Sequence, residues 1–238
     1  MALLKHIPNT ITSMNLLAGI MGVIFTLEGH LEWAFTLMIL AAVFDFCDGL
    51  AARLLGAYSP IGGELDSLAD LVSFGVLPAL MLYKVMPADA PAILRYIPLF
   101  VAVMSAVRLA KFNVDTRQTL DFLGLPTPSC AMVCGSLACF LQAGGGLPAG
   151  AGVWLLDAIA VLLGLLLVSE VPMFGMKIKK GHKLLDPKRI AFLILAAAAV
   201  LAVVLLRQHW SLAVLAVFFI YVVENLVLAV INSFPRGA

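Results

Sequence analysis

The sequence predicts an all-α, polytopic membrane protein with about eight transmembrane helices. Of its 238 residues, 63% are hydrophobic and 12% are charged, and the mean hydropathy is +1.07. A soluble domain carries about 25% charged residues, so this composition excludes an ordinary soluble domain. The net charge of +1 and the lack of a basic domain give no indication of a nucleic-acid partner.

Eight apolar segments carry this prediction, because a transmembrane helix needs about 20 mostly apolar residues. No soluble insertion divides them, so we expect residues 1–238 to form a single integral-membrane domain. The first segment has no small-residue cleavage site, and we expect a retained helix rather than a signal peptide. In chain order the candidate spans are 11–28, 32–55, 63–84, 93–113, 127–144, 152–173, 190–206 and 211–232.

The limits of these spans are marked, in chain order, by residues that cap or interrupt helices. Asn9 or Thr10 can cap the first span, and the turn 28–30 ends it. The turns 56–60, 86–89 and 144–148, rich in glycine and proline, follow the second, third and fifth spans. A basic segment, 177–189, precedes the seventh and is expected to serve as a topology signal that attracts anionic lipid.

Lysine and arginine residues predict the orientation, because they concentrate in cytoplasmic loops. With the N-terminus in the cytoplasm and eight crossings, 12 of the 15 basic residues lie on the cytoplasmic side. We therefore expect a protein of the cell membrane with both termini in the cytoplasm. The three on the opposite side are Lys84, Arg95 and Arg207.

Four aspartates lie where the second and third spans meet. They form the pattern Asp45-x2-Asp48-Gly49-x2-Ala52-Arg53, then eight residues, then Gly62-x3-Asp66-x3-Asp70. Charged groups within membrane segments are costly and mark functional sites. Residues three and four apart share a helix face, so the turn at 56–60 lets both sets of carboxylates face each other at the cytoplasmic surface.

Converging carboxylates repel unless a cation neutralises them, and oxygen ligands suit Mg²⁺ or Mn²⁺. Two such ions would form a clamp for phosphoryl displacement. Gly49 and Gly62 leave room for a ligand against the backbone, and Arg53 offers a planar fork to phosphate. Phosphoryl transfer with two divalent ions is therefore the predicted chemistry.

Two other interpretations of the aspartates are open. They could pair with basic residues, but only Arg53 lies in the same stretch. They could instead form the cation pathway of a transporter. A permeation path would place some acids at the middle of the membrane, whereas these cluster at one face.

The pattern resembles, position for position, the signature of the CDP-alcohol phosphotransferase family, D-x2-D-G-x2-A-R-x8-G-x3-D-x3-D. The resemblance implies that Asp45, Asp48 and Asp66 are metal ligands. It implies that Asp70 is the general base and also touches the second metal. It further implies CDP binding by residues of the signature and of the first span, and a homodimer. The implied CDP-binding residues are Gly49, Ala52, Arg53, Gly62, Asn9 and Thr12.

Further stretches are similar to the serine-specific branch of this family, the CDP-diacylglycerol–serine O-phosphatidyltransferases. They are 7–12 with Asn15, 64–76, 108–113 and 122–128. The resemblance implies transfer of the phosphatidyl group from CDP-diacylglycerol to the hydroxyl of L-serine, with release of CMP. A sister enzyme that uses glycerol 3-phosphate or an inositol phosphate as acceptor is the alternative, and a cation transporter is the alternative of another class.

The carboxylate of serine needs a cation, and Arg108, Lys111 and Asn113 at the end of the fourth span are the candidates. Arg108 and Lys111 are three apart and are expected on one face. The competing interpretation is topological: basic residues at a cytoplasmic helix end reach the membrane surface. Asn9, Thr12 and Asn15 are expected to help bind the nucleotide, and the alternative is that Asn9 or Thr10 only caps the first span.

Other polar residues in the apolar spans give weaker signals. Glu170, Glu224 and Asn225 are expected to form hydrogen bonds between helices or to line a lipid cavity. The four cysteines lack metal-binding spacing and are expected to be small buried hydrophobic residues. They are Cys47, Cys130, Cys134 and Cys139.

Overall fold

The computed structural model describes residues 6–114, 122–147, 151–174 and 187–233. Nearly all of this chain is helical, and helices occupy each of the eight predicted spans. In chain order the elements are α1 (His6–Glu28), α2 (Leu31–Leu55), α3 (Pro60–Asp70), a π-helix (Leu71–Val76), α4 (Leu77–Val85), α5 (Ala92–Arg95), a 3₁₀ helix (Ile97–Leu99), α6 (Phe100–Val114), β1 (Phe122–Leu123), α7 (Thr127–Gln142), α8 (Gly152–Val168), β2 (Pro172–Met173), α9 (Pro187–Leu205) and α10 (Trp210–Ser233).

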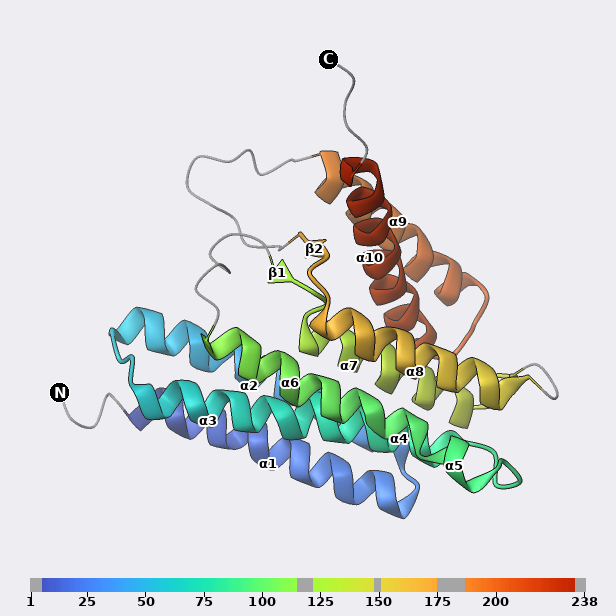
Figure 1. The fold of residues 1–238 in the computed structure, drawn as a ribbon, viewed down its shortest axis with the longest axis horizontal. Coiled ribbons are helices and arrows are strands. Elements are labelled where there is room, and N and C mark those ends of the chain that lie inside the picture. The colour runs from blue at the N-terminus through green and yellow to red at the C-terminus, as the bar shows by residue number, and fades with distance from the viewer. Residues whose placement is uncertain (1–5, 115–121, 148–150, 175–186, 234–238) are drawn as a thin grey trace.

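The helices form a bundle with a divergent C-terminal pair. Helices α1, α2, α3, α4 and α6 run alongside one another, whereas α9 and α10 incline steeply away from them (Figure 1). Helix α8 packs on α6, and α10 packs on both α9 and α7. Phe35, Met38, Phe74 and Met81 are fully buried at the centre of the apolar core.

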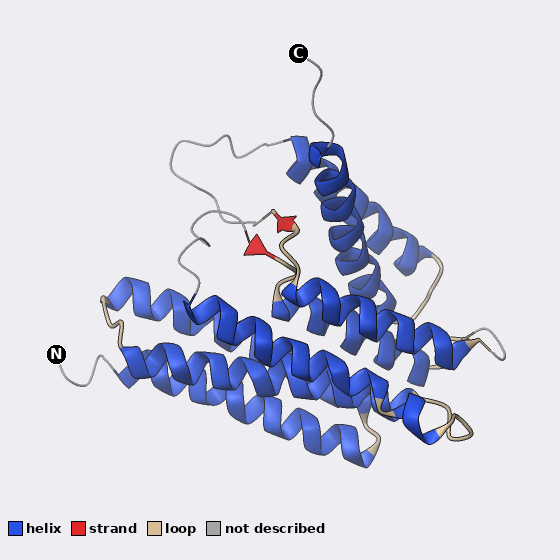
Figure 2. Ribbon diagram, viewed as in Figure 1, coloured by secondary structure: helices blue, strands red, loops and turns tan. Residues whose placement is uncertain are grey.

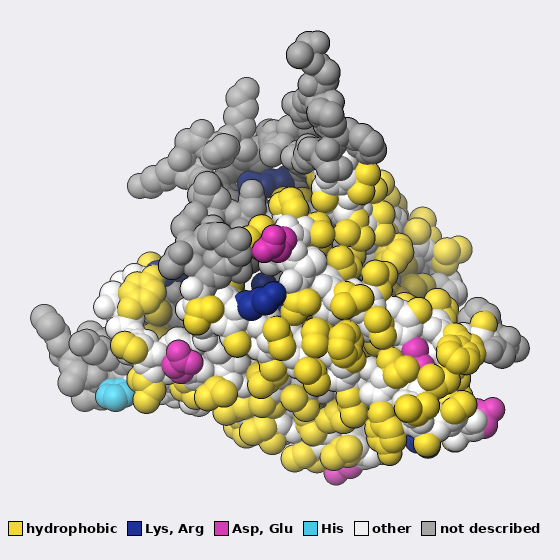
Figure 3. Space-filling view, in the orientation of Figure 1, with side chains coloured by type: hydrophobic (Ala, Val, Ile, Leu, Met, Phe, Trp, Pro, Cys, Tyr) yellow, Lys and Arg dark blue, Asp and Glu magenta, His cyan; other side chains and the backbone are white. Residues whose placement is uncertain are grey.

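The surface confirms a polytopic membrane protein. Within the described residues, 5 helical segments are long and apolar enough to cross a membrane, and three shorter apolar helices accompany them. Hydrophobic side chains cover most of the face shown in Figure 3. Large exposed apolar residues such as Trp33, Phe46 and Leu54 would be unfavourable in water. Lipid contact accounts for their exposure.

Three predicted spans differ from a simple helix. The fourth consists of α5, the 3₁₀ helix and α6 in succession. The third is α3, the π-helix and α4 in unbroken succession, and its wider middle turns follow directly after Asp70. The sixth ends at Val168, five residues before its predicted limit. Beyond it the backbone pairs with the segment that precedes α7: Val171 accepts from Gly124 N at 2.9 Å, and β2 pairs with β1 (Figure 2). Glu170 therefore lies outside the helix, contrary to the prediction.

The turn between α2 and α3 has well-defined ends. Gly56 closes α2 in the left-handed conformation (φ 58°), and its N–H donates to Ala52 O. Ser59 caps α3 by accepting from Gly62 N at 3.1 Å, and Pro60 occupies the first turn. These local signals reverse the chain within four residues and bring the ends of α2 and α3 together.

The cysteines behave largely as predicted. Cys130, Cys134 and Cys139 are buried in α7, and Cys47 is partly buried in α2; all four are free thiols. None belongs to a metal-binding group among the described residues.

Candidate active site

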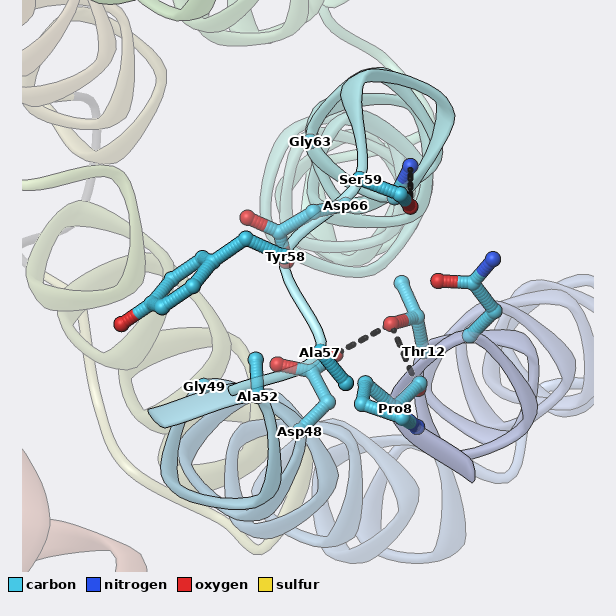
Figure 4. A pocket seen from close by; sticks show the side chains of 12 residues that line it. Pro8, Thr12, Asp48, Gly49, Ala52, Ala57, Tyr58, Ser59, Gly63 and Asp66 are labelled. Carbon is cyan, nitrogen blue, oxygen red and sulfur yellow. Dashed lines mark hydrogen bonds between the residues drawn. The ribbon is translucent and has the colours of Figure 1, made fainter. Parts of the chain in front are cut away.

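A pocket of about 210 Å³ opens between the start of α1, the end of α2 and the start of α3 (Figure 4). Asp48 and Asp66 approach it from α2 and α3, and Thr12 lies on its α1 side (Figure 4). The short turn between α2 and α3 forms the rest of the wall. The lining residues are Pro8, Asn9, Thr12, Asp48, Gly49, Ala52, Ala57, Tyr58, Ser59, Gly62, Gly63 and Asp66.

Three of the four predicted aspartates form one cluster. Asp45, Asp48 and Asp66 each bring a carboxylate oxygen within 4.8 Å of those of the other two. Asp66 Oδ1 is buried and has no hydrogen-bond partner among the described residues. Like charges at this separation, together with an orphaned buried oxygen, are unfavourable unless a cation is present. The donor set is all oxygen and fits a hard divalent ion.

Asp70 lies beside this cluster rather than in it. Its side chain is buried, and Oδ1 accepts a hydrogen bond from Asn15 Nδ2 at 3.1 Å. It interacts electrostatically with Asp45, Asp66 and Asp48. The structure therefore separates a group of three potential ligands from a fourth carboxylate that has its own polar partner.

Helix α1 contributes a direct contact to the cluster. The Thr12 hydroxyl lies 2.6 Å from Asp48 Oδ2 and 3.0 Å from Pro8 O, and Thr12 is buried. Asn9 lies on the pocket wall with its Oδ1 close to Gly62. Both residues thus line the pocket from α1.

The small residues of the signature line the pocket, and its arginine does not. A Cβ atom on Gly49 would meet nothing within 4 Å, whereas one on Gly62 would lie 2.9 Å from both Asn9 Oδ1 and Ser59 Oγ. Arg53 is exposed one turn beyond Gly49, and its Nε donates to Gly49 O at 2.9 Å. This bond leaves the terminal nitrogens of the guanidinium for a ligand.

The three candidates for the acceptor site lie in different environments. Arg108 is only 8% exposed, donates from Nη1 to Thr127 Oγ1 at 2.8 Å and interacts electrostatically with Asp70. Its Nε has no hydrogen-bond partner among the described residues. Lys111 is exposed, with Nζ 3.5 Å from Val168 O. Asn113 is also exposed and is hydrogen-bonded to Ser67. Only Arg108 is buried beside the aspartates.

Several residues at the site escaped the sequence prediction. Tyr58 and Ser59 line the pocket from the turn, and the Ser59-Pro60 pair is a helix-start signal that could have indicated this position. Ser73 follows Asp70 by three residues and so shares its face. Thr127 gave no signal, because its contact with Arg108 depends on the packing of α6 and α7.

Two other predicted features have mixed outcomes. The greater part of the basic segment, 177–186, lies outside the described residues. Asn225 is buried, accepts from Phe174 N at 2.7 Å and donates to Tyr221 O. It thus connects α10 to the non-helical chain after β2, rather than to another helix as the hydrogen-bonding alternative expects.

Comparison with known proteins adds independent information. The family model described as CDP-alcohol phosphatidyltransferase matches residues 5–169. The chain is 36% identical over 211 residues to a CDP-diacylglycerol--serine O-phosphatidyltransferase of Mycobacterium leprae, covering 84% of this chain and 66% of the relative. It is 30% identical to the protein of the same name from Methanocaldococcus jannaschii, covering 90% and 91%. An archaetidylserine synthase of Methanothermobacter thermautotrophicus is 35% identical over 55% of this chain and 56% of that protein.

Proposed function

The chain belongs to the CDP-alcohol phosphatidyltransferase family, and we propose that it transfers the phosphatidyl group of CDP-diacylglycerol to the hydroxyl of L-serine, giving phosphatidylserine and CMP. The observation that carries this proposal is the cluster of Asp45, Asp48 and Asp66, of which Asp48 and Asp66 line a pocket together with the small residues of the family signature. The names of the relatives support serine as the acceptor.

Asp45, Asp48 and Asp66 would hold divalent metal, and we propose Mg²⁺ or Mn²⁺, with two ions in the complete site. When bound, such ions neutralise the diphosphate of the donor and the charge that develops during phosphoryl displacement. The orphaned oxygen of Asp66 supports its place in the ligand set. Gly49, Ala52 and Gly62, together with Asn9, Thr12 and Arg53, would bind the CDP moiety.

Asp70 is the proposed general base. The serine hydroxyl oxygen forms a bond to the phosphorus that carries diacylglycerol, and the bond from that phosphorus to the CMP oxygen breaks. The electron pair leaves with CMP, and the hydroxyl proton passes to the Asp70 carboxylate. A positioned carboxylate of this kind contributes about 10²–10⁴-fold in rate.

Arg108 is the proposed partner of the serine carboxylate. It is buried, lies in the electrostatic range of Asp70 and has a free Nε donor among the described contacts. Lys111 and Asn113 are exposed and would act further from the reacting atoms. The topological role suits Lys111 better than Arg108. The positive-inside rule concerns basic residues at the membrane surface, and the Arg108 side chain is buried.

The membrane context completes the proposal. We place the protein in the cytoplasmic membrane, with both termini and the aspartates on the cytoplasmic side and the lipid chains between helices. A homodimer is the proposed assembly. The excess of lysine and arginine on that side, 12 of 15 in the sequence, supports this orientation through the positive-inside rule.

The test is CMP release by purified protein in detergent with CDP-diacylglycerol and Mg²⁺ or Mn²⁺. L-serine, glycerol 3-phosphate and inositol phosphate are compared as acceptors. Release with serine alone is expected. Release with another acceptor would replace serine and retain the metal site. No release from folded protein with any acceptor would overturn the enzyme assignment in favour of cation transport, for which ion flux into liposomes is the direct assay.

A further inference from the structure

Helix α1 and the π-helix after Asp70 approach each other at backbone distance. A Cβ atom on Gly19 would lie 2.9 Å from both Cα and Cβ of Ser73. Asn15 lies one turn before Gly19 on the same face of α1. The missing side chain at Gly19 therefore allows Asn15 to reach the helix that carries Asp70.

Asn15 and Ser73 form a hydrogen-bonded chain to Asp70. Ser73 Oγ lies 2.7 Å from Asn15 Oδ1 and 2.7 Å from Ala69 O, so the two oxygens share its one proton. Asn15 Nδ2 donates to Asp70 Oδ1 at 3.1 Å. Asn15 and Ser73 are both fully buried. Asn15 is also absent from the lining of the pocket, where Asn9 and Thr12 are present. The Asn15 amide is thus hydrogen-bonded to the Asp70 carboxylate and does not line the pocket proposed for the donor.

The chain has a defined direction. An asparagine side chain has one end that only accepts and one that only donates. The oxygen of Asn15 faces Ser73 and its nitrogen faces Asp70. The reversed amide would place its oxygen against the Asp70 carboxylate, which also only accepts, and would lose that hydrogen bond. A buried polar group with all partners satisfied holds a single orientation.

We propose that Asn15, oriented by Ser73, is a positioning residue that binds Oδ1 of Asp70 and directs Oδ2 toward the hydroxyl of the acceptor. The proposal rests on the proposed function, since it assigns the geometry of the base in that reaction. It also replaces nucleotide binding as the role of Asn15. Fixing a catalytic group in its productive orientation lowers the barrier without altering substrate binding.

The experiment compares Asn15→Leu and Ser73→Ala with the wild type and with Ser136→Ala. Leucine approximates the shape of asparagine and removes both hydrogen bonds. Ser136 is an equally buried serine that bonds only within its own helix, α7, and is the matched control. Three quantities are measured: kcat and KM from CMP release, the affinity for CDP-diacylglycerol, and the Tm in detergent.

We expect kcat of Asn15→Leu to fall by about 10- to 150-fold, the rate equivalent of one hydrogen bond to a charged group. Ser73→Ala should lower kcat by less. The Asn15 amide can still donate to Asp70 and loses only the partner that helps to fix its orientation. The KM values, the donor affinity and the Mn²⁺ affinity should stay at wild-type levels in both. Ser136→Ala should match the wild type in kcat.

Three results would overturn the proposal. They are an unchanged kcat in Asn15→Leu, a weaker donor affinity that accounts for the whole loss, and a loss of Mn²⁺ affinity, which would make Asn15 a support of the metal site. The proposal is still supported if Asn15→Leu lowers the Tm no more than Ser136→Ala does and also lowers kcat. If the wild type releases no CMP, the proposed function itself is refuted. The wild type is therefore assayed before the variants, which separates this failure from a failure of the role of Asn15.

Discussion

Replacing Gly19 with alanine should damage catalysis more than its single added methyl group suggests. The new Cβ would lie 2.9 Å from the Cα and Cβ of Ser73, whereas carbon atoms pack at about 3.5–4.0 Å. The contact involves the main chain of Ser73, so no side-chain rotation can relieve it. The two helices must therefore separate by about 0.6 Å or more.

That separation acts on Asp70 through Asn15. The Asn15–Asp70 distance of 3.1 Å would grow to about 3.7 Å, beyond hydrogen-bonding range. Losing a bond to a charged group corresponds to about 1.5–3 kcal/mol, or about 10- to 150-fold in kcat. Overpacking adds about 1–3 kcal/mol of destabilisation, which lowers the Tm by about 2–4 °C per kcal/mol in a chain of this size.

The assay is steady-state CMP release together with thermal unfolding in detergent. Gly146→Ala is the control, because a Cβ atom there would meet nothing within 4 Å and its loop is far along the chain from the site. A Gly19→Ala protein with wild-type kcat would show that the close approach of α1 to the π-helix has no part in orienting Asp70. A lower Tm with normal kcat would lead to the same conclusion.

Four further substitutions test the site. Asp70→Asn should lower kcat by about 10²–10⁴-fold while donor affinity persists; substantial residual turnover counts against the base role. Asp66→Ala should raise the Mg²⁺ or Mn²⁺ concentration needed for activity, and an unchanged metal dependence removes Asp66 from the ligand set. Gly62→Ala should raise the KM for the donor alone, because its Cβ would lie 2.9 Å from Asn9 Oδ1; a normal donor KM would contradict the assignment of this wall to CDP. Arg108→Ala should raise the KM for serine by about 10-fold or more and that for the donor by less, and an unaffected serine KM returns Arg108 to a topological role.

Sequence patterns were sufficient for the helices and for the aspartates. Long apolar segments and turn residues place the spans because the membrane requires continuous helices of a minimum length. The spacing from Asp45 to Asp70 places the carboxylates because helical periodicity and one short turn leave little freedom. Both depend on local geometry, which a linear sequence records.

Tertiary contacts explain what the sequence did not reveal. The hydrogen bond that Asp70 accepts comes from Asn15, which lies 55 positions away in the chain. Arg108 and Lys111 share a helical face by spacing, yet α7 covers only Arg108 through Thr127. Helix α8 ends early because the chain after it pairs with the chain before α7. The hydrophobic periodicity of one segment cannot predict a hydrogen bond to another segment.

The origin of the site from α1, α2 and α3 has a consequence for biogenesis. The pocket lining runs from Pro8 to Asp66, and these three helices are consecutive in the chain. Contacts between neighbouring segments form early and rapidly, since little chain must be closed into loops. The nascent chain can therefore assemble its aspartate cluster before α9 and α10 have left the ribosome. We expect lesions in the C-terminal pair to reduce the yield of inserted protein and to leave the affinity of the surviving molecules for metal intact.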